Sequence, residues 1–218
     1  VMRAYGLAQV VESKHQNFQR GDVVLAGVGL GWQDYAVLDP KRPAAINKLP
    51  PGIAPLHFLN VLGMTGITAY FGLLEVGLPK PGETVVVSGA AGATGSVVAQ
   101  IARIKGCRAV GIAGGDEKCR WLREDCGLDG VIDYKREDVG KQLRALCPNG
   151  VNVFFDNVGG ELLDVVLTRL AQKARVVICG GISVYNDASR GYALRNVLSL
   201  LVNRARMEGF VVFDYQAR

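Results

Sequence analysis

The sequence predicts an α/β protein built on a doubly wound parallel sheet. Three observations predict it: strand-like and helix-like segments alternate from about residue 83 onward, the strand-like segments are unbroken apolar runs, and a glycine-rich turn follows the first of them. Strands buried on both faces read as continuous apolar runs, which is what parallel sheets require. Strict alternation of strand and helix places crossover helices on both faces of such a sheet.

The alternating region contains six expected strands and five expected helices. We expect strands at 84–88, 108–113, 131–134, 151–156, 175–179 and 209–213. We expect helices at 94–105, 117–126, 138–146, 161–170 and 194–202. In the first of these helices, Val97, Val98, Ile101 and Ile104 recur at helical spacing. Six strands fit the two-halved, Rossmann-type dinucleotide-binding fold.

The first part of the chain has a different character. Short apolar runs between turn signals predict strands at 23–26 and 34–38 in a small β-rich module. Pro50-Pro51-Gly52 breaks the chain, and a helical stretch is expected from about 55 to 75. We therefore expect a domain at 1–60, followed by a helical connection and the sheet domain at 61–218.

Composition excludes several classes of protein. Of 218 residues, 49% are hydrophobic and 21% are charged, which is the balance of an ordinary globular protein. The net charge of +5 comes from scattered residues, so it favours an anionic small ligand over nucleic acid. No apolar run reaches the length of a membrane span, so no membrane association is expected.

The cysteines and histidines predict a metal-free protein of the cytoplasm. Five cysteines are widely spaced without a CxxC pair, as expected for reduced thiols in the cytosol. His15 and His57 have no Cys or carboxylate partner at ligand spacing, so no metal site is expected. No signal peptide is visible, and the chain opens with Val1, so we expect it to be a fragment that begins within a longer protein.

The strongest motif is the turn Ser88-Gly89-Ala90-Ala91-Gly92-Ala93-Thr94-Gly95, which leaves the first strand and opens the first helix. Gly92 would let the backbone approach a pyrophosphate, and Gly95 would let the helix pack closely on the strand. The helix N-terminus supplies free N–H groups and a positive dipole end. Ala90 replaces the first glycine of the usual GxGxxG pattern. The motif in this context predicts a dinucleotide cofactor.

Residues after the second strand leave the choice of cofactor open. Asp116 lies where NAD enzymes place an acid for the ribose 2′-hydroxyl. Lys118 and Arg120 follow it, and a cation there suits the extra phosphate of NADPH. Lys118 could equally belong to a solvated helix face. We expect Asp116 to act at the start of the second helix, where an acid suits the dipole.

Two further loops are expected to face the cofactor. Residues 156–160 end the fourth strand and residues 179–183 end the fifth. Ligands in such folds bind beyond the carboxyl ends of strands. Gly159 and Gly180 could equally be simple turn residues.

Several blocks together resemble the zinc-free branch of the medium-chain dehydrogenase/reductase superfamily, namely the prostaglandin reductases and alkenal or enone double-bond reductases. The matching blocks are residues 63–72, 90–98, 155–161, 179–186 and 206–210, in the family's order. The resemblance spans nearly the whole chain, and it implies that the β-rich module is part of a GroES-like catalytic domain. It also implies a homodimer formed through the last strand of the sheet.

The resemblance implies an NADPH-dependent enzyme that transfers hydride to the β-carbon of an α,β-unsaturated ketone or aldehyde, with a proton added at the α-carbon. It implies NADPH contacts from Gly92, Ala93, Thr94, Gly95, Lys118, Tyr134 and Asn157. It also implies contacts near the nicotinamide from Cys179, Gly180, Gly181, Ile182, Ser183, Val184, Tyr185, Phe210, Val211 and Val212.

The chain departs from this family at the expected catalytic residue. Family members often carry a tyrosine eight residues before the matched Phe210, but this chain has Val202 there. Tyr70 is our substitute candidate for the group that bonds the substrate carbonyl, with a role as a core aromatic as its alternative. The Val202 departure leaves room for an NADPH-binding sensor or structural relative without turnover, and a quinone oxidoreductase is a further alternative. The missing ligands disfavour a zinc alcohol dehydrogenase.

Overall fold

The computed structural model describes residues 4–27, 30–41, 46–186 and 191–215. The chain divides into two compact units, Val1–Met64 and Thr65–Arg218, and each is described by itself. The assignment of residues 1–60 and 61–218 to a catalytic and a cofactor domain stays a prediction. No helix in the described part of the chain is both long enough and apolar enough to span a bilayer.

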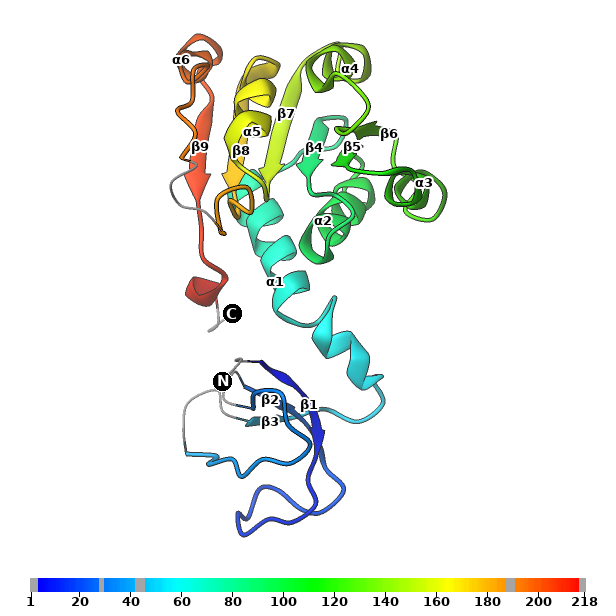
Figure 1. The fold of residues 1–218 in the computed structure, drawn as a ribbon, viewed down its shortest axis with the longest axis vertical. Helices are drawn as coiled ribbons and strands as arrows, with labels where there is room; N and C mark the ends of the chain where they lie inside the picture. The colour runs from blue at the N-terminus through cyan, green and yellow to red at the C-terminus, as the bar shows by residue number, and fades with distance from the viewer. Residues whose placement is uncertain (1–3, 28–29, 42–45, 187–190, 216–218) are drawn as a thin grey trace. The chain divides into compact units, whose positions relative to one another are not determined.

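The larger unit contains a six-stranded parallel sheet (Figure 1). Its strands are β4 (Thr84–Ser88), β5 (Arg108–Ala113), β6 (Gly130–Asp133), β7 (Val151–Asp156), β8 (Leu170–Ile178) and β9 (Arg206–Gly209). Their order is β6-β5-β4-β7-β8-β9. The chain starts in the middle at β4, runs out through β5 and β6, and returns to the other side of β4 for the second half. This order confirms the predicted doubly wound, Rossmann-type sheet.

Helices cover both faces of the sheet. One hydrophobic core joins the sheet to α1 (Met64–Phe71), the π-helical turn η2 (Gly72–Gly77), α2 (Ala93–Ile104) and α3 (Asp116–Glu124). The opposite core contains α4 (Val139–Leu146), α5 (Gly160–Leu167) and α6 (Leu198–Asn203). Val85 and Val87 of β4 belong to the first core and Val86 to the second. Both faces of β4 are therefore buried, which explains its unbroken apolar run.

The end of the sheet corrects one prediction. The last strand was expected at 209–213, but it spans Arg206–Gly209, and the 3₁₀ turn η4 (Val212–Tyr215) follows it. Phe210 leaves the sheet because its ring packs against Gly72, where a Cβ atom would lie 2.3 Å from the ring atom Cζ. Val211 and Phe213 are more than half exposed. The apolar residues after β9 therefore form a turn anchored by the Phe210 ring and not a strand.

Three helix boundaries differ from the prediction by more than two residues. The expected helical stretch 55–75 is interrupted: η1 (Pro55–Leu59) is a separate 3₁₀ helix, and α1 starts only at Met64. Between them the chain turns at Gly63, where a Cβ atom would lie 2.2 Å from the carbonyl oxygen of Phe58. Helix α5 ends at Leu167 because β8 already begins at Leu170. Helix α6 starts at Leu198, four residues later than expected from 194.

The smaller unit contains a three-stranded antiparallel sheet of β1 (Gly6–Gln9), β2 (Val23–Ala26) and β3 (Ile46–Lys48), in that order. The strand predicted at 23–26 is confirmed, and β1 and β3 were missed. The strand predicted at 34–38 is wrong: Tyr35 and Val37 are largely or fully exposed, and the segment forms no strand. Strand β2 is paired by β1 on one side and β3 on the other, so no edge of it is left for residues 34–38.

Candidate dinucleotide site

The predicted cofactor residues lie beyond the carboxyl ends of all six strands. They are therefore at the same end of the parallel sheet. Gly92–Gly95 follow β4, Lys118 lies in α3 after β5, Tyr134 follows β6, Asn157 follows β7, Cys179–Tyr185 follow β8, and Phe210–Val212 follow β9. The centre of this end is the switch point between β4 and β7, where the strand order reverses. Open α/β sheets bind ligands at this position.

The glycine turn after β4 leads directly into an uncapped helix. Gly89 has a left-handed backbone with φ +58°. A Cβ atom at Gly95 would lie 2.3 Å from the carbonyl oxygen of Gly89, so only glycine lets α2 start this close to β4. Gly92 is the N-cap of α2, and no side chain caps the helix. The amides of the first turn have no partner within the helix, so this turn can bind a phosphate.

A buried carboxylate joins the two strands at the switch point. Asp156 accepts a hydrogen bond of 2.6 Å from the Ser88 hydroxyl and further bonds from the backbone amides of Val158 and Gly159. Burial raises the pKa of Asp156, while the bonds from Ser88, Val158 and Gly159 oppose this rise. Asn157 donates its backbone amide to the Ser88 hydroxyl and its side-chain amide to the Ser88 carbonyl. The network holds Asn157 over the end of β4.

The loop after β8 is bonded to the loop after β7. Cys179 donates its amide to the carbonyl of Asp156 over 2.9 Å, and the Ser183 hydroxyl donates to the carbonyl of Val158 over 2.6 Å. A Cβ atom at Gly180 would lie 2.7 Å from the Tyr185 hydroxyl, so glycine there makes room for that ring. Burial raises the pKa of Cys179 to about 11. Cys179 is therefore a neutral thiol at pH 7 and not a nucleophile.

Five aromatic rings connect α1 with the end of the sheet. Tyr70 meets Phe71 edge-on at 5.2 Å, and Phe71 stacks on Tyr215 at 4.5 Å. Tyr215 contacts Phe210, which in turn contacts Phe155 of β7. The Tyr70 side chain is 50% exposed, so its alternative as a core aromatic is wrong. Tyr215 was missed because nothing in the sequence indicates that η4 folds back onto α1.

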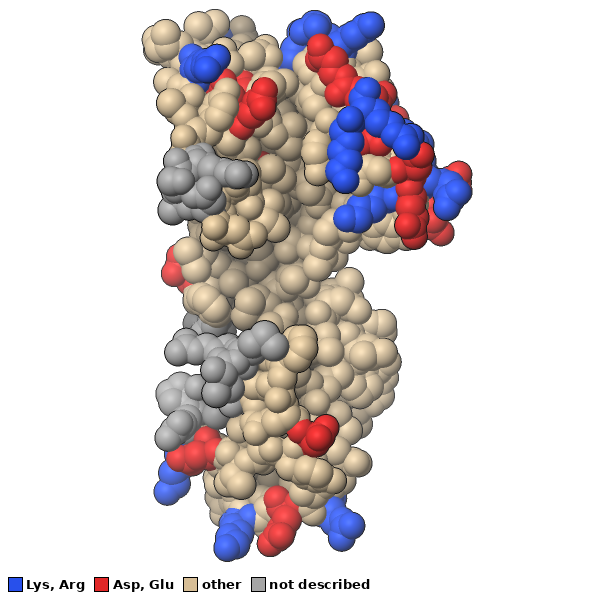
Figure 2. Space-filling view, viewed as in Figure 1, with Lys and Arg blue, Asp and Glu red and all other residues tan. Residues whose placement is uncertain are grey.

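The corner after β5 and β6 gathers charged residues. Asp116 is the first residue of α3, as expected. Lys118 is the third residue of the same helix, and its side chain is exposed. The Tyr134 ring lies against Gly114, where a Cβ atom would be 2.7 Å from the ring. Asp116 forms an ion pair with Arg136, a residue that sequence reasoning missed. Figure 2 shows basic and acidic side chains side by side over this region around α3.

Within the described residues, no group of three His, Cys, Asp or Glu side chains is placed to hold a metal ion. The absence of a metal from the complete protein stays a prediction.

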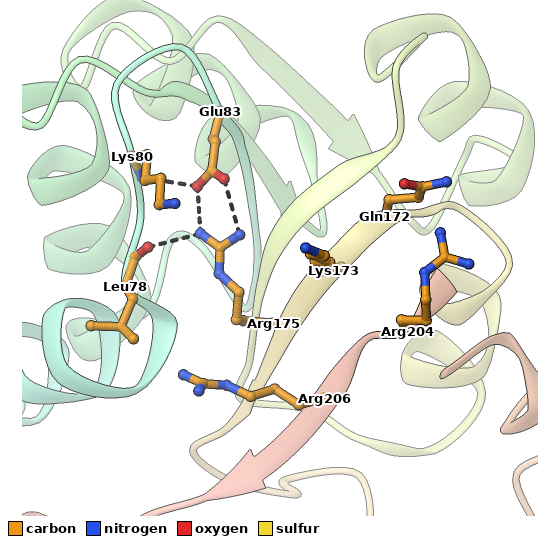
Figure 3. Close-up of a pocket in the computed structure, with 9 residues that line it drawn as sticks. Leu78, Lys80, Glu83, Gln172, Lys173, Arg175, Arg204 and Arg206 are labelled. Atoms are coloured by element: carbon orange, nitrogen blue, oxygen red, sulfur yellow. Dashed lines mark hydrogen bonds and ion pairs between the residues drawn. The ribbon is translucent and has the colours of Figure 1, made fainter. Parts of the chain in front are cut away.

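A pocket of about 540 Å³ lies at the opposite end of the sheet (Figure 3). Its Arg175 forms an ion pair with Glu83 and donates to the carbonyls of Gly77 and Leu78, each over 2.8 Å. Arg206 donates to the carbonyl of Val76. These arginines satisfy the last carbonyls of η2, which a helix cannot satisfy internally. The pocket is therefore a structural corner remote from the candidate site.

Comparison with known proteins agrees with this geometry. The sequence profile of the zinc-binding dehydrogenase family matches residues 93–218, and that of the N-terminal domain of oxidoreductases matches residues 1–46. A Bacillus subtilis relative, named as an NADP-dependent oxidoreductase, is 46% identical over 98% of this chain and 62% of its own length. The NADP(+)-dependent 2-alkenal reductase of Nicotiana tabacum is 42% identical over 97% of this chain and 61% of its own length.

A solved structure shares the fold over the whole chain. The crystal structure of CurA from Vibrio vulnificus in complex with NADPH superposes with a TM-score of 0.89 at 42% identity. The match covers 100% of this chain and 64% of the CurA chain. The chain thus spans somewhat under two thirds of the length of these relatives.

Proposed function

Because the chain belongs to the zinc-binding dehydrogenase family, within the medium-chain dehydrogenase/reductase superfamily, we propose that the protein reduces the carbon–carbon double bond of α,β-unsaturated ketones and aldehydes with NADPH. The observation that carries the proposal is the glycine turn, which opens onto the uncapped start of α2 at the switch point. The similarity to the 2-alkenal reductase supports the substrate class.

The residues at the glycine turn fit the pyrophosphate of NADPH. A Cβ atom at Gly92 would meet only the Gly89 carbonyl oxygen, at 3.1 Å, and would otherwise project into open space over the turn. We propose that the amides of Ala93, Thr94 and Gly95 bind the pyrophosphate there. Lys118 would bind the 2′-phosphate, with Tyr134 and Asn157 along the cofactor. Residues 179–185 and 210–212 would border the nicotinamide.

NADPH supplies the hydride when it is bound, and the protein positions the substrate and stabilises the charge on its carbonyl oxygen. We propose the phenol of Tyr70 as the hydrogen-bond donor to that oxygen. Its exposure supports this role, since a donor must reach the substrate. The ring contacts from Phe71 through Tyr215 to Phe210 hold this part of α1 beside the loop proposed to border the nicotinamide.

A substrate panel tests the reaction. We expect the reduction of small enones and enals with NADPH to be faster than the oxidation of simple alcohols with NADP⁺. The reason is that the carbonyl oxygen of an enone needs only a hydrogen-bond donor and no metal. Steady-state kcat/KM values for enones, enals, alcohols and quinones make the comparison, with Tyr70→Phe measured alongside. Faster alcohol oxidation would contradict the proposal, and a preference for quinones would replace it with quinone reduction.

Lys118→Ala is expected to weaken NADPH binding about 10- to 150-fold and to leave NADH binding nearly unchanged. A charge-assisted bond to the 2′-phosphate has this strength, and only NADPH carries that phosphate. Fluorescence titration of both cofactors measures the change. Lys141→Ala removes an exposed lysine of α4 as a control. Equal losses for both cofactors would show that Lys118 does not bind the phosphate.

We also propose that the protein forms a homodimer through β9. This strand is the edge of the described sheet, and within the described residues it pairs only with β8. The adjacent α6 exposes Leu198, Leu201 and Val202. An edge strand beside an apolar surface favours pairing with a second copy.

Light scattering is expected to give the mass of a dimer. Leu201→Asp should give a monomer because it places a charge in the proposed interface, whereas Ile104→Asp, at an equally exposed position of α2, should not. A monomer mass for the unmodified protein across a wide concentration range would contradict the proposal.

The cysteines support a proposal about location. All five are unpaired, and four of them are buried. Free thiols are typical of proteins in a reducing compartment. We therefore propose that the protein acts in the cytoplasm, and fractionation of cells that produce it would test this.

A further inference from the structure

An ion pair lies at the corner where the 2′-phosphate is proposed to bind. Asp116 begins α3, and Arg136 lies in the turn after β6. The side chains are 72% and 64% exposed, respectively. Exposed ion pairs are weak, because water and salt screen them. The guanidinium of Arg136 can therefore shift within this pair to bond a second, more strongly charged ligand at little cost in free energy.

A buried carboxylate fixes the position of the segments that carry Asp116 and Arg136. Asp133, the last residue of β6, accepts the backbone amide of Gly115 over 3.1 Å and that of Lys135 over 3.0 Å, both on Oδ1. One oxygen thus joins the start of α3 to the turn that carries Arg136. The bonds from Gly115 and then Lys135 lower the pKa of Asp133 despite its burial, so it is ionised at neutral pH. The two sides of the corner are fixed relative to each other.

Asp116 poses an electrostatic problem for binding NADPH. It precedes Lys118 by two residues in the first turn of α3, and side chains two residues apart on a helix do not face each other, so Lys118 does not neutralise it. A free carboxylate there would repel the 2′-phosphate and would suit the ribose hydroxyls of NADH instead. The attraction of Lys118 alone would be partly cancelled. Arg136 is the cation that contacts Asp116, and it can remove this repulsion.

We propose that Arg136 determines cofactor specificity by neutralising Asp116 and by contributing, with Lys118, to the binding of the 2′-phosphate. This inference rests on the proposed use of NADPH. A guanidinium is well suited to the role, because its planar set of donors can bond a carboxylate and a phosphate at the same time. The corner would then hold the phosphate between α3 and the turn after β6.

Binding measurements on the whole protein test the proposal. Dissociation constants for NADPH and NADH are measured by fluorescence titration for the unmodified protein, Arg136→Gln, Asp116→Asn and the double variant. Arg144→Gln in the last turn of α4 is the control for loss of one exposed positive charge. Arg136→Gln is expected to weaken NADPH binding about 10-fold or more and to change NADH binding less than about 3-fold. In the Asp116→Asn background, the same change is expected to weaken NADPH binding at least about 3-fold less.

Conservative replacement separates charge from folding. Arg136→Lys is expected to retain most of the NADPH preference, and thermal unfolding should be the same for all variants because the pair is exposed. The inference is overturned if Arg136→Gln leaves NADPH binding unchanged, weakens both cofactors equally, or acts independently of Asp116. If Lys118→Ala removes the NADPH preference while Arg136→Gln does not, the inference about Arg136 is wrong, but the proposed use of NADPH still stands. If the unmodified protein binds NADH more tightly than NADPH, the proposed function fails as well.

Discussion

Gly95→Ala is expected to destabilise the larger unit by about 3 kcal/mol and to remove measurable NADPH binding. The added Cβ atom would lie 2.3 Å from the carbonyl oxygen of Gly89 and 2.9 Å from its carbonyl carbon. Both are backbone atoms, so the first turn of α2 must move away from β4, and overpacking of this kind is strongly destabilising. The amides proposed to bind the pyrophosphate would move with it. Urea unfolding and cofactor titration measure the two effects.

Gly92→Ala is the matched control for this prediction. Gly92 has φ −83°, which alanine adopts freely, and its Cβ atom would have one close contact at 3.1 Å. The Gly92→Ala variant should therefore have nearly the same unfolding free energy as the unmodified protein. It should bind NADPH more weakly, because a methyl group would project over the turn. Equal stability of the two variants would show that α2 does not need its close approach to β4.

Asp156→Ala is expected to destabilise the same unit by about 3 kcal/mol. The Ser88 hydroxyl and the amides of Val158 and Gly159 would lose their buried acceptor, and each unsatisfied donor is costly. Asn157 should lose its position over β4, so cofactor binding should weaken too. Asp125→Ala, at an exposed carboxylate after α3, should change the unfolding free energy by less than about 0.5 kcal/mol. Similar values for the two variants would contradict the structural role of Asp156.

The pH dependence of stability provides a second measurement on the same carboxylate. The folded protein holds the proton of Asp156 more tightly than the unfolded chain, because burial raises its pKa. The protonated Asp156 side chain therefore stabilises the folded protein fully below about pH 3.9. This stabilisation is lost as the pH rises through the raised pKa. Asp156→Asn carries no titrating group there. The unfolding free energy of the unmodified protein minus that of Asp156→Asn should fall over that range, and a rise would contradict the shift.

The buried part of the fold was predictable because burial leaves a simple pattern. Strands β4, β5 and β7 each contain a run of buried apolar residues, and all three were predicted with the bounds they have. The edge strand β9 carries Arg206 and Glu208, so it lacks that pattern and was misplaced onto the apolar residues that follow it. The start of β8 was missed because Gln172 and Lys173 interrupt its apolar run, and Lys173 has a left-handed backbone with φ +57°.

The candidate site was predictable only where neighbouring residues form a motif. The turn from Gly89 to Gly95 could be found because its residues are consecutive and follow a strand. The bond from Ser88 to Asp156 and the pair of Asp116 with Arg136 join residues from different strand–helix units. No spacing rule links such residues, since their contact depends on the order of the strands in the sheet. Sequence reasoning therefore identified Asn157 but not the network that holds it.

The position of β4 in the sheet has a consequence for synthesis on the ribosome. Its first neighbour, β5, follows after one helix, but its second neighbour, β7, is made only after two further helices and β6. Until Asp156 has left the exit tunnel, one edge of β4 and the Ser88 hydroxyl have no native partner. Such distant pairing slows folding, because a long loop must close before the contacts form. The glycine turn therefore leaves the ribosome before the residues of β7 and its following loop that pack beside it in the folded protein.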